Sequence, residues 1–152
     1  MNVRPALPAD IPRLLALIRR YWDFEGIQGF NALRVELVLK QLLAEAALGA
    51  AWVAEDAEEL LGYAIVVHVL SVEHQGLMAE IDEFFVLPEV RSRGIGGELL
   101  KTLEASLARH GYVRLQLQLA RTNATARAFY ASRGYAPREG YELLDKRLVP
   151  RT

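Results

Sequence analysis

One stretch of the sequence, EIDEFFVLPEVRSRGIGGELL (residues 80–100), constrains the fold most because its character changes twice. Its segment FFVL (84–87) is an apolar run typical of a buried strand, and that run stops at Pro88. The arginine- and glycine-rich loop RSRGIGG (91–97) follows, and a helical pattern over residues 95–109 begins inside it. A helix N-terminus carries unpaired N–H groups and partial positive charge, and glycine lets an anion approach them closely. The stretch therefore predicts a strand, an anion-binding loop and a helix in direct succession.

The rest of the chain alternates between helical and strand-like patterns with no repeat or linker. We expect helices within 7–24, with Asp10 as a cap, and over Ala32–Leu48, 95–109 and 123–134. We expect strands over 2–6, 50–56, 60–70, 80–87 and 113–119, and two more within 135–148 around a turn at Pro137–Gly140. The run 60–70 is nearly all apolar, which indicates burial on both faces.

The resulting order, β-α-α-β-β-β-α-β-α-β-β, predicts the fold class. Early hairpins followed by strands that helices separate favour an α/β fold of the α+β type, with a mixed, mostly antiparallel sheet and helices on both faces. The length of 152 residues predicts a single domain over 1–152.

Composition excludes several classes of function. The chain has no cysteine, so disulfides, thiolate zinc sites and a cysteine nucleophile are excluded, and its three histidines are scattered, so no metal site is expected. The formal net charge of -1 argues against nucleic acid as a partner. No apolar stretch approaches the ~20 residues that span a bilayer, and early charges and prolines argue against a signal peptide. We expect a cytoplasmic protein with no membrane partner.

The RSRGIGG loop leaves its anion open when read by itself. It lacks the Lys-Ser/Thr ending of a P-loop, and Leu99 stands where a dinucleotide fingerprint needs a third small residue. A phosphate- or nucleotide-binding domain and a loop of solvated arginines are both alternatives at this point.

Two motifs together resemble the signature of the GNAT superfamily of N-acetyltransferases. The first is R-x-x-G-x-G at Arg91, Gly94 and Gly96, directly after DEFFVLPEV. The second is the downstream NATARAFYASRGY (123–135), and the element order matches over essentially the whole chain. Within the superfamily, residues 80–100 and the late EGYELLDKRL look most similar to polyamine and related small-amine acetyltransferases.

The resemblance implies acetyl-CoA as cosubstrate. Its pyrophosphate would rest on the backbone N–H groups of residues 91–97, and its pantetheine arm would pair with the strand ending at Val86. That strand would splay from the strand at 113–119 to admit the cofactor. The residues assigned to the cofactor in this way are Phe85, Val86, Arg91, Ser92, Arg93, Gly94, Ile95, Gly96, Gly97, Asn123 and Tyr130.

The resemblance also implies catalytic roles, each with a structural alternative. Tyr130 would be the general acid for the departing thiolate, or a packing tyrosine. Asn123 would bond the cofactor arm, or cap a helix. Asp82 and Glu83 are neighbours on a strand, so they should point to opposite faces unless a bulge intervenes. The resemblance to polyamine enzymes places Asp82 at the position of the base, with Glu83 orienting the substrate or binding water. The residues themselves leave open which of the two takes the amine proton through water, and either could instead line a solvated groove.

The acceptor is expected to contact YWDFEGIQGF (21–30), where Trp22, Phe24 and Glu25 combine aromatic and acidic character suited to a cation. Aromatics that cap the core are the alternative. The leading interpretation is an N-acetyltransferase that moves acetyl to a primary amine of a small, cationic molecule. The competing one is a non-catalytic acyl-CoA-binding module. A homodimer is compatible with the family, with Leu70 and Leu143 as candidate contacts.

Overall fold

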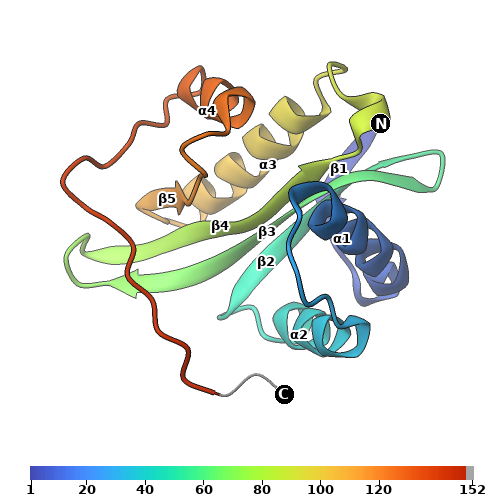
Figure 1. Cartoon of the computed structure of the whole chain (residues 1–152), viewed down its shortest axis with the longest axis horizontal. Helices are drawn as coiled ribbons and strands as arrows, with labels where there is room; N and C mark the ends of the chain where they lie inside the picture. Colours follow the sequence, from blue (N-terminus) through green and yellow to red (C-terminus); the bar gives the residue numbers. More distant parts are fainter. Residues whose placement is uncertain (150–152) are drawn as a thin grey trace. The chain divides into compact units, whose positions relative to one another are not determined.

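Five strands and four α-helices make up the fold in the computed structural model, which describes residues 1–149 (Figure 1). Their order is β1 (Asn2–Pro5), α1 (Ile11–Glu25), α2 (Ala32–Ala44), β2 (Gly49–Asp56), β3 (Glu59–Ser71), β4 (Gly76–Val86), α3 (Ile95–Arg109), β5 (Arg114–Leu117) and α4 (Ala124–Ala131). Short 3₁₀ turns, η1 (Pro8–Asp10) and η2 (Pro88–Val90), precede α1 and follow β4. The chain forms two units by its contacts, Met1–Gln118 and the residues from Leu119 on. A single domain over 1–152 stays a prediction.

The first unit is built on one sheet with the strand order β1-β2-β3-β4-β5. The first four strands pair antiparallel, and β5 alone pairs parallel, with β4. This is the mixed, mostly antiparallel sheet that the sequence predicts. The sequence predicts burial over 60–70, and Leu60–Val66 is buried throughout because β3 is the central strand and helices cover both faces. The prediction is wrong for the end of the run, where Val69 and Leu70 are 40% and 76% exposed.

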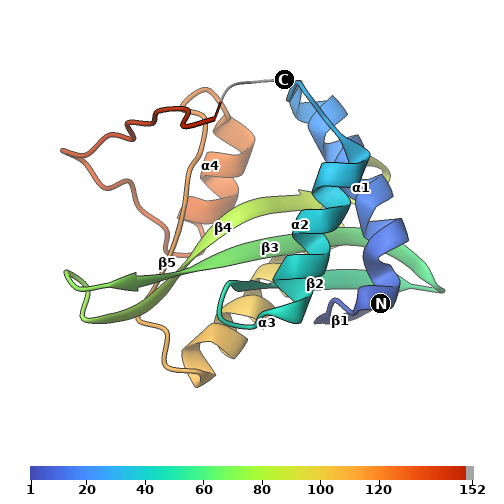
Figure 2. The same ribbon diagram turned by 90° about the horizontal axis from the view of Figure 1, so that it is seen from below.

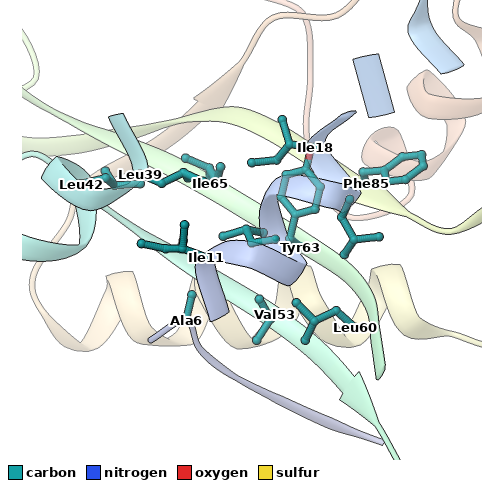
Figure 3. Close-up of a cluster of buried hydrophobic side chains, with 13 residues drawn as sticks. Ala6, Ile11, Ile18, Leu39, Leu42, Val53, Leu60, Tyr63, Ile65 and Phe85 are labelled. Carbon is teal, nitrogen blue, oxygen red and sulfur yellow. The ribbon is translucent and has the colours of Figure 1, made fainter. Parts of the chain in front are cut away.

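Alternation along the strands sends apolar side chains to two separate cores. On one face, Val53, Tyr63 and Ile65 pack with the apolar stripes of α1 and α2, which include Ile18 and Leu39 (Figure 3). On the other face, Ala54, Leu61 and Val86 pack with Ile95 of α3. Figure 2 shows α1 and α2 on one side of the sheet and α3 on the other. Helices on both faces are thus confirmed.

Asp10 differs from its expected role as a helix cap. Its side chain makes no capping bond to α1. Instead it accepts bonds from Arg4 at 2.8 and 2.9 Å, from Arg13 at 2.7 Å and from the Leu7 N–H at 2.7 Å. Glu55 of β2 completes the cluster by accepting from both arginines. The carboxylate is 2 % exposed, so charge pairing with two arginines outcompetes the capping geometry.

The second helix ends earlier than the expected Leu48. The Glu45 backbone is extended, and α2 stops at Ala44. The carbonyl of Leu48 accepts the His68 N–H at 2.9 Å, which draws this residue into the sheet beside β3. A residue committed to the sheet ladder cannot continue a helix, and the sequence pattern does not show that competition.

The second unit contains α4 and no strand within residues 119–149. The two strands expected within 135–148 are therefore wrong for this structure. Alternating apolar residues supply strand propensity, but a strand forms only where a second strand takes up its hydrogen bonds.

No helix among residues 1–149 is long and apolar enough to cross a membrane.

Candidate active site

A β-bulge in β4 shapes the site. Ile65 of β3 pairs with Glu83 and the next residue, Val66, pairs with Ile81, so Asp82 is an extra residue with no partner in β3. A bulge bends its strand and re-aims side chains that strict alternation would send to opposite faces. This is the exception that the sequence left open for the neighbouring carboxylates. The parallel pairing of β4 with β5 ends at Ile81 and Leu117, directly before the bulge.

Glu83 lies on the face of the sheet that α1 and α2 cover. One carboxylate oxygen accepts the Trp22 indole N–H at 2.8 Å, and the other accepts the Tyr63 hydroxyl at 2.9 Å. Burial raises the pKa of Glu83, while these two hydrogen bonds oppose the rise because they favour the charged form. Glu83 is therefore an oriented carboxylate, tied to a helix and to the central strand.

Asp82 keeps solvent access, and no residue within 1–149 donates a hydrogen bond to its carboxylate. Partial desolvation raises the pKa of Asp82, and the charge of Glu80 adds to the rise. Burial raises the pKa of Tyr21 to about 12, with the charges of Glu25, Glu83 and Asp82 contributing. The charges of Asp82 and Glu83 thus both raise the pKa of the same tyrosine of α1. The pair combines one fixed carboxylate with one that can exchange protons with water.

The end of β4 presents backbone groups away from β3. Leu87 donates its N–H to the Leu61 carbonyl at 2.9 Å, and groups on successive residues alternate between the two edges. The N–H and C=O of Val86 therefore face the edge where β5 would lie if its pairing continued. The Val86 carbonyl accepts the Arg91 Nε–H at 3.0 Å. The Arg91 guanidinium lies over the Phe24 ring, 4.6 Å from its centroid. Its side chain is thus turned to the strand end in this structure.

The RSRGIGG loop has the backbone that the sequence predicts for an anion site. α3 spans Ile95–Arg109, and Gly94 precedes it with a left-handed φ of 79°. Ser92 also has a positive φ, 68°, which is uncommon for a residue other than glycine. Such turns direct successive N–H groups to one side, and the first turn of α3 leaves its own N–H groups unpaired within the helix. Ile95 is buried in the core, so only its backbone is available to a ligand.

The predicted acceptor residues lie at the end of α1. Phe24 is exposed and its ring centroid is 6.1 Å from that of Phe85. Glu25 ends the helix and is exposed. Trp22 is half-buried, and its N–H is directed to Glu83 rather than to solvent. The first unit therefore brings together α1, the β4 carboxylates, the β4 end and the glycine loop.

Asn123 and Tyr130 belong to the second unit. The Asn123 side chain accepts the Ala126 N–H at 3.1 Å, so it does cap α4. Tyr130 packs edge-to-face with Phe129 and Tyr135, at centroid distances of 5.1 and 5.4 Å. Their roles toward a cofactor stay predictions.

Tyr63 is the site residue that sequence reasoning missed. It sits in the apolar run of β3 and is fully buried, and its hydroxyl anchors Glu83. A buried tyrosine hydroxyl nearly always finds a hydrogen-bond partner, so a tyrosine inside an apolar strand was the available signal. The partner depends on the register of β3 against β4, which no short-range pattern reveals.

A mixed sheet whose fourth strand leads into a glycine loop and a helix is the arrangement that the resemblance to N-acetyltransferases implies. The acetyltransferase (GNAT) family model matches residues 12–135, and the chain belongs to that family. It is 28% identical over 148 residues, 93% of each chain, to YhfO of Bacillus subtilis, an uncharacterised N-acetyltransferase.

Solved structures agree with this fold. An integron cassette protein from the mobile metagenome of Cole Harbour Salt Marsh superposes with a TM-score of 0.86 and 27% identity, covering 98% of this chain and 91% of that one. A predicted acetyltransferase from Clostridium acetobutylicum, solved with acetyl-CoA, has a TM-score of 0.80 at 20% identity, covering 95% of each chain. The chain is an N-acetyltransferase of the GNAT type.

Proposed function

We propose that this enzyme transfers the acetyl group of acetyl-CoA to a primary amine of a small, cationic acceptor. The observation that carries the proposal is the bulge at Asp82, which sets a solvent-accessible carboxylate beside the fixed carboxylate of Glu83. Two adjacent carboxylates near the aromatic end of α1 favour a positively charged acceptor. The similarity of residues 80–100 to small-amine acetyltransferases supports the same class of substrate.

Acetyl-CoA is the proposed donor, held by the backbone of the first unit. The N–H groups of residues 91–97 bind the pyrophosphate, and the Val86 edge of β4 pairs with the pantetheine arm. The left-handed backbone at Ser92 and Gly94 supports the first contact, and the outward Val86 groups support the second. Arg91 donates to the Val86 carbonyl in this structure, so its side chain turns away when the arm pairs there.

The reaction is direct attack of the neutral amine nitrogen on the thioester carbonyl carbon. A C–N bond forms, and the Val86 N–H stabilises the oxyanion of the tetrahedral intermediate. Asp82 takes the amine proton through a water molecule, and Glu83 orients the acceptor. The C–S bond then breaks, and Tyr130 protonates the thiolate. The products are an amide and free CoA.

Replacing Tyr130 by Phe is expected to lower kcat by about 10- to 100-fold, because the thiolate loses its proton donor. A thiolate is a fair leaving group at neutral pH, so the loss stays below that of the base. Binding of acetyl-CoA should be unchanged in calorimetry. If kcat keeps its wild-type value across the pH range, Tyr130 is a packing residue and not the acid.

A panel of amines tests the proposal. Each amine is incubated with enzyme and acetyl-CoA, and a thiol reagent measures released CoA without background because the chain has no cysteine. Polyamines, aminoglycosides and amino-acid amides are expected to react faster than neutral or acidic amines of similar size. Equal rates for neutral amines would contradict a cationic acceptor.

The alternative is a non-catalytic acyl-CoA-binding module. It needs the loop and the β4 edge but neither carboxylate nor Tyr130, so acetyl-CoA binding without turnover of any amine would favour it.

A homodimer also stays a proposal. Leu70, which is 76% exposed near the β3–β4 turn, is a contact that cross-linking would test.

A further inference from the structure

Trp22 connects three parts of the first unit. Its indole N–H donates to Glu83 at 2.8 Å. Its ring meets the Phe30 ring edge-to-face at a centroid distance of 5.3 Å, and its carbonyl accepts the Ile27 N–H at 2.9 Å. Ile27 and Phe30 belong to the segment between α1 and α2. One residue in the last turn of α1 thus anchors that segment and holds a carboxylate of the site.

The two donors to Glu83 come from different elements. Trp22 approaches one oxygen from α1, and Tyr63 approaches the other from β3. Hydrogen bonds to an ionised group are shorter and stronger than neutral ones, so both oxygens of the Glu83 carboxylate are held in place. If the indole N–H is removed, a half-buried carboxylate keeps one donor and loses its orientation.

We propose that Trp22 is a positioning residue of the transfer site, which acts through Glu83 by holding it as an oriented carboxylate against the positive charge of the acceptor. The proposal rests on the proposed function, because Glu83 meets a cation only if the enzyme acetylates one. It refines the expectation that Trp22 contacts the acceptor directly. The indole N–H is already committed to Glu83, and the ring is committed to Phe30.

The direction of the pH effect follows from the groups around Glu83. Tyr21 and Glu25 of α1, Tyr63 of β3, and Asp82 with Glu80 on β4 surround or electrostatically influence this part of the site. Burial raises the pKa of Glu83, and the Trp22 bond opposes that rise. Losing the indole N–H therefore raises the pKa further. A protonated Glu83 no longer attracts the positive charge of the acceptor. Acceptor binding therefore weakens as the pH falls, and in the variant it weakens at a higher pH than in the wild type.

The kinetic test is Trp22→Phe, which keeps an aromatic ring against Phe30 and removes the N–H. The KM of the acceptor is expected to rise about tenfold, as for loss of one hydrogen bond to a charged group. The acid limb of kcat/KM should move to higher pH, while kcat and the KM of acetyl-CoA stay near wild type. In the Glu83→Gln background the same substitution should add no further loss, because both changes act on one interaction.

The matched control is Trp52→Phe. The chain has two tryptophans, and Trp52 is a buried residue of β2. This control makes the same chemical change and is expected to lower stability while leaving the acid limb in place. If the acid limb of kcat/KM shifts equally in both variants, the shift reflects a general loss of packing, and that result would overturn the proposal.

A second measurement on the wild-type chain needs neither a substrate nor a folded Trp22 variant. Two indole N–H resonances are expected in a ¹H–¹⁵N spectrum, and Trp52→Phe assigns them. The Trp22 resonance should titrate with the ionisation of Glu83 and lose that titration in Glu83→Gln. A pH-independent Trp22 resonance would overturn the proposal. If the resonance titrates but no amine is acetylated, the coupling stands and the proposed function fails.

Discussion

Replacing Asp82 by Asn is expected to lower kcat by about 10²- to 10⁴-fold, the usual contribution of a positioned general base. Asparagine has similar size and keeps the bulge, but it cannot take a proton. The KM of the acceptor should change little because Glu83 remains charged, and acetyl-CoA affinity should be unchanged. Partial desolvation raises the pKa of Asp82, and the base works ionised, so wild-type kcat rises with pH through that pKa. The variant should lack this rise.

The control for Asp82 is Glu73→Gln, in the turn between β3 and β4. Its side chain is 70% exposed and takes no part in the proposed chemistry, so kcat should match wild type within about twofold. A kcat for Asp82→Asn within about threefold of wild type, with the pH dependence intact, would remove Asp82 from the role of base. Glu83 would then be the next candidate.

The largest effect on stability is expected for Asp10→Asn. The carboxylate is buried and bonds Arg4, Arg13 and the Leu7 N–H, which joins β1, η1 and α1. Removing one partner of a buried ion pair costs about 3–5 kcal/mol because the remaining charges are left uncompensated. For a chain of this length, 3 kcal/mol corresponds to a fall in Tm of about 6–12 °C. Thermal unfolding at neutral pH measures it.

The effect of Asp10 also has a defined pH dependence. The bond from Arg4 is the main reason that the pKa of Asp10 in the folded state lies well below the unfolded value of about 3.9. The stabilisation is therefore fully present above about pH 4 and is lost as the pH falls toward the folded pKa. The difference between wild type and Asp10→Asn should shrink below pH 4. A constant difference across this range would mean that packing, not charge, accounts for it.

The exposed ion pair between Arg20 and Glu89 is the matched contrast for Asp10. Its N–O distance is 2.9 Å, but both side chains are about half exposed, at 51% and 55%. Surface pairs of this kind contribute about 0–1 kcal/mol. Arg20→Gln should therefore lower Tm by far less than Asp10→Asn. An equal fall in Tm for the two variants would mean that burial does not strengthen the Asp10 ion pairs.

Periodicity predicted most of the fold because it records which face of each element is buried. α3 spans Ile95–Arg109 as predicted, since Gly94 and the amphipathic pattern both mark its start. The end of α2 and the strands expected within 135–148 failed for one shared reason. Both depend on whether a distant strand supplies or withholds hydrogen-bond partners, as His68 does for Leu48. Local pattern contains no information about those partners.

The site was predictable in its residue types and not in its pairings. The order strand, loop, helix predicts an anion site at RSRGIGG, and the residue types of Asp82 and Glu83 make them the candidate carboxylates. Their division into a solvent-accessible group and a fixed group depends on the bulge and on two donors, Trp22 and Tyr63. A bulge adds one residue to a strand, and no local sequence pattern predicts where it lies. The donors lie 61 and 20 residues from Glu83.

We propose that the β4 edge and the RSRGIGG loop bind acetyl-CoA for transfer to an amine. The most direct measurement is thermal unfolding with acetyl-CoA, and with NADH and ATP in parallel. A ligand at 100 times its Kd stabilises the folded state by about 2.7 kcal/mol, and we expect that selective rise in Tm with acetyl-CoA. No shift with acetyl-CoA at millimolar concentration, or a larger one with NADH or ATP, would contradict the claim.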